Sequence, residues 1–195
     1  MIRLADIIFS LLGILALSPL FMIISFLIFL DSPGGIIFKQ KRVGKKGCDF
    51  NLYKFRTMYQ GSEKSGLLTV NPDDKKITKI GYYLRKYKMD ELPQLFNVLE
   101  GDMSIVGPRP EVRKYVNFYN DRQRETLKVK PGITDMASLV YFDENKLLED
   151  KKEPEKYYIE RIMPHKAELN MKFIDNPNLI NYFNIIFRTI WKIIK

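Results

Sequence analysis

The chain has 195 residues and a formal net charge of +9 at pH 7. Its single cysteine, Cys48, and single histidine, His165, exclude an internal disulfide, a Cys/His zinc site and any Ser-His-Asp triad that does not use His165. Catalysis would therefore have to use carboxylates, lysines, arginines or hydroxyls. The excess positive charge indicates an anionic partner: nucleic acid, a membrane surface or phosphorylated small molecules. The length leaves room for one domain of ordinary size with an appendage.

The first predicted element is an apolar run, residues 7–30, which contains no charged residue. About 20 apolar residues are enough for a helix to cross a bilayer. A signal peptide has a shorter apolar core and a small-residue cleavage site, which this run lacks. We therefore predict that the run inserts into a membrane.

Ser18 and Pro19 interrupt this run near its middle. Proline removes a helix hydrogen bond, and in hydrocarbon the Ser18 hydroxyl can bond to the carbonyl that proline leaves free. From the residues alone two arrangements stay open: a kinked spanning helix, or a helix-break-helix hairpin that enters and leaves by one face.

The charges that flank the run constrain its orientation only in part. The positive-inside rule places its C-terminal flank in the cytoplasm, because five cations follow it: Lys39, Lys41, Arg42, Lys45 and Lys46. At the other flank Arg3 is offset by Asp6, so the side of the N-terminus stays undecided.

Two β-rich runs, residues 36–41 and 50–56, are joined by the Gly- and Lys-rich residues 44–47, as in a hairpin. Lys54 and Arg56 are two residues apart, so on a strand both side chains point to one face. Taken alone, this pair indicates a solvated charged face.

Residues 60–74 lack periodicity and contain several Gly, Ser and Pro residues. This composition predicts a mobile loop, and such loops beside charged sites often act as lids. A helix predicted over residues 79–87 then leads to the central part of the chain.

The central run, residues 88–110, opens with two adjacent carboxylates, Asp90 and Glu91. They stand where a short apolar helix is predicted to begin, and Gly101 is predicted to end it. Residues 107–110, Gly-Pro-Arg-Pro, form a rigid turn with one guanidinium.

Acidic residues at a helix start usually stabilise the helix dipole, which would explain Asp90 and Glu91 on their own. Here four cations from neighbouring predicted elements can converge on the pair: Lys54, Arg56, Arg85 and Arg109. A diphosphate substrate requires this combination, with cations for its phosphates and carboxylates for a nucleophile or a metal.

The C-terminal third is rich in charged helical segments. Residues 111–127 are predicted to be helical, with their charges on a solvated face. Residues 154–172 have the pattern of a helix pair interrupted at Pro164, and we expect His165, which follows that proline, to be a surface residue. Residues 179–195 repeat apolar and aromatic side chains at helical spacing with basic residues between them. Such a helix can lie in a bilayer interface or pack on the core, and both stay open.

Several ordered motifs now point to a family. After the apolar run come Phe38–Gly44, Tyr53–Met58, Leu84-Arg85, Asp90–Leu95, Gly101–Pro110 and Lys130–Thr134. The chain resembles the bacterial sugar transferase family, the monotopic phosphoglycosyl transferases, over roughly residues 1–134 and more weakly beyond.

The resemblance implies transfer of a phosphosugar from a UDP-sugar to polyprenyl (undecaprenyl) phosphate, with release of UMP, as the first membrane step of glycoconjugate biosynthesis. It implies Mg²⁺ as cofactor and a covalent intermediate on Asp90. The expected location is the bacterial inner (cytoplasmic) membrane, with the catalytic part on the cytoplasmic face. The helix broken at Ser18 and Pro19 is re-entrant in the family, which favours the hairpin.

We therefore expect Asp90 and Glu91 to be catalytic, with Glu91 on Mg²⁺. Arg85 and Arg109 are expected to bind phosphate oxygens, with Lys54 and Arg56 as further substrate-binding cations. The predicted fold is α+β and mainly helical. Residues 1–32 form the re-entrant membrane helix, and residues 33–195 form a catalytic domain with a small β-hairpin and an amphipathic C-terminal helix.

The chain departs from the family pattern after Thr134. Many members continue with Gly, then Trp or Leu, and a Gln-Val pair, whereas this chain has residues 135–141, Asp-Met-Ala-Ser-Leu-Val-Tyr. The sugar is therefore not predicted, and a homodimer is left open. Two rival functions, a nucleic-acid-binding module and a non-catalytic membrane scaffold, predict no release of UMP from a UDP-sugar.

Overall fold

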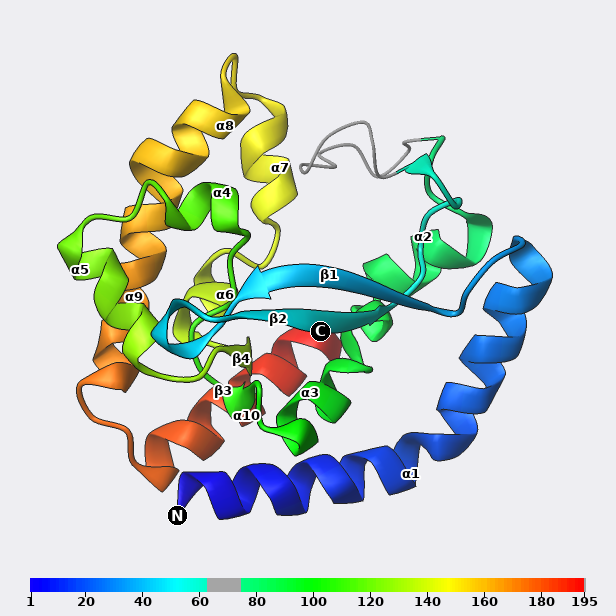
Figure 1. Cartoon of the computed structure of the whole chain (residues 1–195), viewed down its shortest axis with the longest axis horizontal. Helices are drawn as coiled ribbons and strands as arrows, with labels where there is room; N and C mark the ends of the chain where they lie inside the picture. The colour runs from blue at the N-terminus through cyan, green and yellow to red at the C-terminus, as the bar shows by residue number, and fades with distance from the viewer. Residues whose placement is uncertain (63–74, 195) are drawn as a thin grey trace.

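The computed structural model describes residues 1–62 and 75–194. It is mainly helical, as the sequence predicts, and its strands form two small two-stranded sheets, of which the sequence predicted one, the hairpin (Figure 1). The predicted lid, residues 60–74, lies outside the described residues except for its first three. The helices are α1 (Ile2–Asp31), α2 (Lys79–Lys86), α3 (Gln94–Glu100), α4 (Arg113–Val116), α5 (Asp121–Arg124), α6 (Met136–Val140), α7 (Glu144–Glu149), α8 (Pro154–Tyr157), α9 (Met163–Ile174) and α10 (Leu179–Ile194). The strands are β1 (Ile37–Val43), β2 (Asp49–Phe55), β3 (Ser104–Val106) and β4 (Gly132–Thr134).

Helix α1 is continuous but bent, with Pro19 inside it. Figure 1 shows one arm running beneath the domain from the N-terminus and a second arm rising along its side. An unbroken helix would pair the Leu15 carbonyl with the N–H of residue 19, which proline lacks. The Ser18 hydroxyl donates to that carbonyl at 2.8 Å, so the predicted replacement bond is confirmed.

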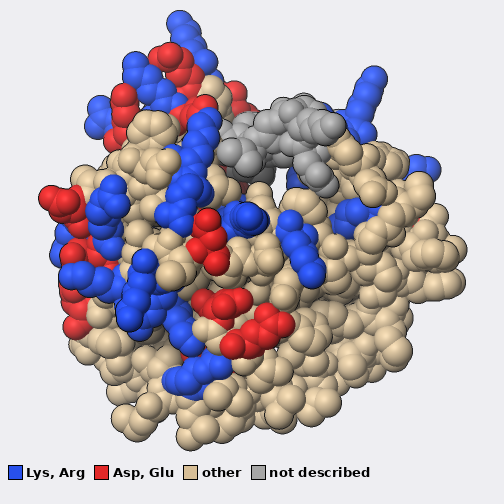
Figure 2. Space-filling view, viewed as in Figure 1, with Lys and Arg blue, Asp and Glu red and all other residues tan. Residues whose placement is uncertain are grey.

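The surface of α1 is apolar and largely uncovered. It is long and apolar enough to cross a membrane by length and composition, and only 11% of its most apolar 18-residue window is buried. Large side chains along both arms are exposed, among them Leu15 at 62%, Met22 at 68% and Phe26 at 60%. Figure 2 shows the same property as a right-hand margin with few charged side chains. This exposure supports the predicted membrane insertion.

Both ends of α1 are bonded to the rest of the fold. Near its start, the buried Asp6 carboxylate accepts hydrogen bonds from the Ser104 hydroxyl (2.9 Å), the Ile105 N–H (2.9 Å) and the Tyr182 hydroxyl (2.8 Å). At its end, the Asp31 carboxylate accepts from the Ile80 N–H at 2.9 Å. Helices α2 and α10 and strand β3 are therefore tied to the two arms of one bent helix.

Strands β1 and β2 form the predicted hairpin, with an antiparallel register from Ile37 opposite Phe55 to Val43 opposite Asp49. Phe55 packs with Ile24 and Ile28 of α1 and with Leu84 of α2 in one buried cluster. The end of β2 thus packs against both the second arm of α1 and α2.

Strands β3 and β4 pair in parallel, a contact that the sequence patterns did not predict. Their turns approach closely: a Cβ on Gly107 would lie 2.5 Å from the Lys130 carbonyl oxygen, and one on Gly132 would lie 2.1 Å from the Gly107 nitrogen. Only glycine fits at both positions. This approach brings the end of the central run, residues 107–110, beside the motif at 130–134.

The C-terminal part confirms one expectation and differs from another. Residues 111–127 are helical, as predicted, in short pieces. Residues 154–174 form one continuous helical run, so the interruption predicted at Pro164 is wrong. A π-helical turn, Tyr158–Ile162, precedes the proline, and its wider hydrogen-bond spacing accommodates the residue that lacks an N–H.

Helix α10 uses two faces. Tyr182 and Ile185 are buried against Val106 and the first turns of α1, so packing on the core is confirmed for one face. The other face exposes Phe187 at 69% and Trp191 at 71%. The amphipathic pattern therefore reflects a helix attached to the domain with an apolar face left open.

Candidate active site

The carboxylate pair lies in a 3₁₀ turn, Met89–Glu91, that precedes α3. The sequence placed the pair in the first turn of the helix itself, whereas α3 begins at Gln94, after Pro93. Lys88 enters the turn with a left-handed backbone, φ 56°, which is uncommon outside glycine. Gly101 ends α3 as predicted, with φ 101°.

Glu91 is held by two cations from distant segments. Lys54 of β2 donates to Oε1 at 2.8 Å. The Arg109 guanidinium donates to both carboxylate oxygens, with Nη1 at 3.1 Å from Oε2 and Nη2 bonded to Oε1. Burial opposes the charge on Glu91, but these two cations and their hydrogen bonds outweigh it and hold the pKa of Glu91 well below its usual range. Glu91 in turn raises the pKa of Arg109, so each member of this pair favours the charged form of the other.

Asp90 lies in a different environment. It is 8% exposed, and its carboxylate has no hydrogen bond or ion pair among the described residues. Burial raises the pKa of Asp90; Lys54 opposes this rise, Glu91 adds to it, and Arg85 and Arg109 oppose it. Asp90 is thus the carboxylate of the pair whose oxygens are free to react.

The two remaining predicted cations differ in position. Arg85 donates from Nε to the Thr57 hydroxyl at 3.0 Å, and its charge acts on Asp90. Arg56 instead donates to the backbone carbonyls of Ser32, at 2.7 Å, and Pro33, so it fastens the end of α1. Strand β2 ends at Phe55, and the period-two argument that put Lys54 and Arg56 on one face does not extend beyond that residue.

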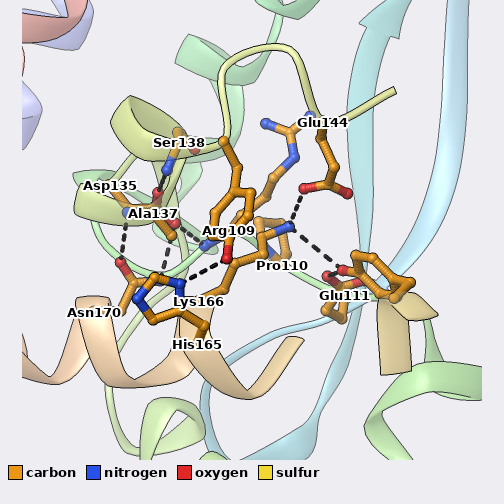
Figure 3. Close-up of polar contacts among 12 residues, drawn as sticks. Arg109, Pro110, Glu111, Asp135, Ala137, Ser138, Glu144, His165, Lys166 and Asn170 are labelled. Atoms are coloured by element: carbon orange, nitrogen blue, oxygen red, sulfur yellow. Dashed lines mark hydrogen bonds and ion pairs between the residues drawn. The ribbon is translucent and has the colours of Figure 1, made fainter. Parts of the chain in front are cut away.

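Two buried polar residues that the sequence analysis did not single out support the site. Asn97 of α3 accepts from the Tyr53 N–H at 2.9 Å and donates to the Asn51 carbonyl at 2.8 Å, which fixes β2, and with it Lys54, against α3. Asp135 accepts from the Arg109 N–H at 2.8 Å (Figure 3). A polar residue within an apolar helix and an acidic residue directly before one were the available signals.

The oxygen atoms of the pair allow a test of whether Mg²⁺ fits. Glu91 Oε1 already accepts two hydrogen bonds and Oε2 accepts one, so Glu91 keeps one free lone pair, while the Asp90 oxygens are unbonded. Over the residues described, no group of three or more Asp, Glu, His or Cys side chains gathers around one point. Mg²⁺ commonly binds through one or two carboxylates together with substrate phosphates. The residues therefore fit a Mg²⁺ ion that arrives with a diphosphate.

The chain thus combines a bent helix that is long and apolar enough to cross a membrane with a small domain in which cations gather around a carboxylate pair. The family model described as "Bacterial sugar transferase" matches residues 1–195. The chain belongs to this family, and the resemblance seen in its motifs is confirmed.

Three curated relatives show how the match is distributed. The chain is 44% identical over 140 residues to a UDP-N-acetylgalactosamine-undecaprenyl-phosphate N-acetylgalactosaminephosphotransferase of Aeromonas hydrophila, covering 70% of this chain and 33% of the relative. It is 34% identical over 198 residues to the UDP-glucose:undecaprenyl-phosphate glucose-1-phosphate transferase of Escherichia coli, covering 97% of this chain and 39% of the relative. A putative undecaprenyl-phosphate N-acetylgalactosaminyl 1-phosphate transferase of Bacillus subtilis is 50% identical over 109 residues, covering 56% of this chain and 61% of the relative. The chain thus spans less than two thirds of the length of each relative.

Proposed function

We propose that the chain transfers a phosphosugar from a UDP-sugar to undecaprenyl phosphate at the cytoplasmic face of a bacterial inner membrane. The products are UMP and undecaprenyl diphosphate sugar. The observation that carries the proposal is the unbonded carboxylate of Asp90 beside a Glu91 whose oxygens are occupied by Lys54 and Arg109. The names of the relatives support the substrate classes, since each names undecaprenyl phosphate.

In the first step an Asp90 oxygen attacks the phosphorus that bears the sugar. A bond from that oxygen to phosphorus forms, the bond to the bridging oxygen breaks, and UMP leaves with the electron pair. An acyl phosphate on Asp90 now carries the phosphosugar. Because Lys54, Arg85 and Arg109 oppose the effect of burial on the Asp90 pKa, they favour the carboxylate form that this step requires.

In the second step a phosphate oxygen of the lipid attacks the same phosphorus. The bond to Asp90 breaks, the carboxylate is restored, and the lipid keeps the phosphosugar. Arg109 and Arg85 present guanidinium groups to the phosphate oxygens, and Glu91 holds Arg109 and Lys54 in place. When bound through Glu91 and the diphosphate, Mg²⁺ would neutralise the charge that develops on the leaving UMP.

The proposed topology is the re-entrant hairpin. A straight helix of 30 residues would be about 45 Å long, whereas the hydrocarbon core of a bilayer is about 30 Å thick. A spanning α1 would place its ends on opposite sides, yet Asp6 and Asp31 both bond to residues of one domain. The bend at Pro19 supports an arrangement in which both ends return to the same face (Figure 1).

The proposed activity is tested by UMP release. Membranes that contain the chain are incubated with a panel of UDP-sugars and undecaprenyl phosphate, and the protein is then analysed by mass spectrometry after acid quench. We expect UMP with at least one sugar, ping-pong kinetics, and a phosphosugar adduct on Asp90. A nucleic-acid-binding module or a passive scaffold would release no UMP. Absence of UMP release with every sugar of the panel would therefore overturn the proposal.

The topology is tested separately, by labelling an Ile2→Cys variant in a Cys48→Ser background with a membrane-impermeant thiol reagent on intact cells. The hairpin predicts no labelling unless the cells are opened. A version that also carries Ser18→Ala and Pro19→Ala regains the backbone bond and is expected to straighten and become labelled from outside. Labelling of the version with native Ser18 and Pro19 would show that the helix spans the membrane.

A further inference from the structure

The segment that carries Arg109 is held at every residue. Four of the five hydrogen bonds to its backbone groups come from neighbouring strands, including the Arg42 side chain: Gly107 N–H to Thr134 O (3.0 Å), Gly132 N–H to Pro108 O (3.0 Å), Arg42 Nη1 to Pro110 O (3.1 Å) and Val43 N–H to Glu111 O (2.8 Å). The fifth joins the Arg109 N–H to the Asp135 carboxylate at 2.8 Å. Because proline lacks an N–H, Arg109 supplies the one backbone donor between Gly107 and Glu111.

The Asp135 carboxylate is buried and is held in place by hydrogen bonds from other residues. Asp135 is 2% exposed, and it is one of the positions at which the chain departs from the family pattern. The oxygen that accepts from Arg109 also accepts from Asn170 Nδ2 of α9 at 3.1 Å, and the other oxygen accepts from the Ser138 N–H (Figure 3). Asn170 is itself buried and accepts from the Ala137 N–H at 3.3 Å. All of these donors are neutral, so the carboxylate charge is not cancelled by a direct ion pair, and it acts on the Arg109 guanidinium.

We propose that Asp135 is a positioning residue for Arg109, and that Asn170 fixes Asp135 for this task. The hydrogen bond to the Arg109 N–H sets the backbone from which the guanidinium reaches Glu91 and, in the proposed function on which this inference rests, the substrate phosphates. Displacement of a substrate-binding group by about 1 Å can lower a rate by about 100-fold. A single buried carboxylate on the far side of the turn therefore controls how well Arg109 is aimed.

A simpler role for Asp135 is that of N-cap for α6, since it accepts from the Ser138 N–H. The substitution Asp135→Ser separates the two roles. Serine is also a good N-cap, but its shorter side chain cannot bond to Ser138 and reach the Arg109 N–H together. If Asp135 only caps α6, this variant keeps its activity.

The experiment is a double-mutant cycle with Asp135→Ser, Arg109→Ala and the double variant in membranes. It measures kcat/KM for UMP release and, by calorimetry, Kd for UDP. We expect Asp135→Ser to lower kcat/KM about 10- to 100-fold in the wild-type background and by less than about twofold where Arg109 is already alanine, because the two act as one unit. Equal factors in both backgrounds, or a variant with wild-type activity, would overturn the inference.

A matched control removes a different cap. Asn120 accepts from the Gln123 N–H at 2.9 Å in α5 and has no bond to residues 107–111. Asn120→Ala should lower the melting temperature with no change in kcat/KM. If the wild-type chain releases no UMP from any sugar, the proposed function fails, and the UDP arm of the cycle still decides the inference: a change in Kd that depends on Arg109 supports it, and one that does not refutes it.

Discussion

The carboxylates of Asp90 and Glu91 belong to adjacent residues, but their surroundings have opposite effects. The cations around Glu91 bond directly to its oxygens and lower its pKa, whereas the same cations act on Asp90 only through space and do not overcome the effect of its burial. One residue is thereby fixed as an anion that organises Lys54 and Arg109, and its neighbour keeps unbonded oxygens. The opposite pKa shifts of these two adjacent carboxylates are thus caused mainly by burial and by cations from distant segments.

The largest expected effect comes from Asp90→Asn. An amide cannot form the acyl phosphate, so UMP release should fall by about 10⁴-fold or more. Because burial disfavours the charge on Asp90, the neutral amide should keep or raise the melting temperature. The measurements are initial rates and thermal unfolding on the same preparation. An enzyme with near-wild-type rate would remove Asp90 from the chemistry.

Next comes Glu91→Gln, for which the comparison predicts the opposite effect on stability. The variant leaves Lys54 and Arg109 without their anion, which costs about 3 kcal/mol of folding free energy. It should also lower the rate by orders of magnitude and raise the Mg²⁺ concentration required. Unchanged metal dependence would refute the metal role of Glu91.

The stability loss of Glu91→Gln has a defined pH dependence. The folded pKa of Glu91 lies below that of the unfolded chain, so its contribution is present above the unfolded value of about 4.3 and is lost as the pH falls through the folded value. The melting temperatures of the variant and the wild type should therefore differ at pH 7 and converge in acid. A difference that persists at the lowest pH would show that Glu91 stabilises the fold by other means.

Arg109→Lys keeps the positive charge but loses the planar guanidinium group, which donates hydrogen bonds from two nitrogens at once. Lysine cannot donate to both Glu91 oxygens and a phosphate together, so kcat/KM should fall about 100-fold. Arg113→Lys is the control, because Arg113 bonds to the Gly47 carbonyl and Asp49 on the exposed surface. If both variants are equally active, the guanidinium of Arg109 has no special role.

The smallest effect is a shift in pH profile for Lys54→Met. Lys54 lowers the pKa of Asp90, and the proposed reaction requires Asp90 as carboxylate. Removal of Lys54 should therefore move the acid limb of the kcat/KM profile to higher pH. Lys41→Met, an exposed lysine on β1, should leave the limb where it is. An unmoved limb in Lys54→Met would mean that another group controls it.

The sequence predicted those parts of the fold that depend on local signals. Each of three features follows from a few neighbouring residues: the β1–β2 hairpin, the end of α3 at Gly101, and the hydrogen bond of Ser18 that replaces the one lost at Pro19. The approach of Lys54 and Arg109 to the carboxylate pair was inferred from residue types alone, and they meet Glu91 from 37 and 18 residues away.

What the sequence could not predict depends on where strands end and on contacts between distant segments. The period-two alternation that placed Arg56 on one face with Lys54 holds only within the strand, which ends at Phe55. The end of a strand was not predictable to one residue. The bonds of Asp135 to Arg109 and Asn170 join segments 26 and 35 residues away, with no repeat or spacing to mark them. Parallel pairing of β3 with β4 is of the same kind, because two runs of three residues carry no periodicity.

The bond between Asp6 and Tyr182 has a consequence for how the protein is made. The two residues are 176 positions apart. At about 5–20 residues per second, a ribosome adds Tyr182 about 9 to 35 seconds after Asp6. Throughout that interval a carboxylate in the first turns of an apolar helix lacks at least one of its three donors, and water must take its place. The order of synthesis therefore favours an aqueous surrounding for this carboxylate until α10 arrives to replace that water.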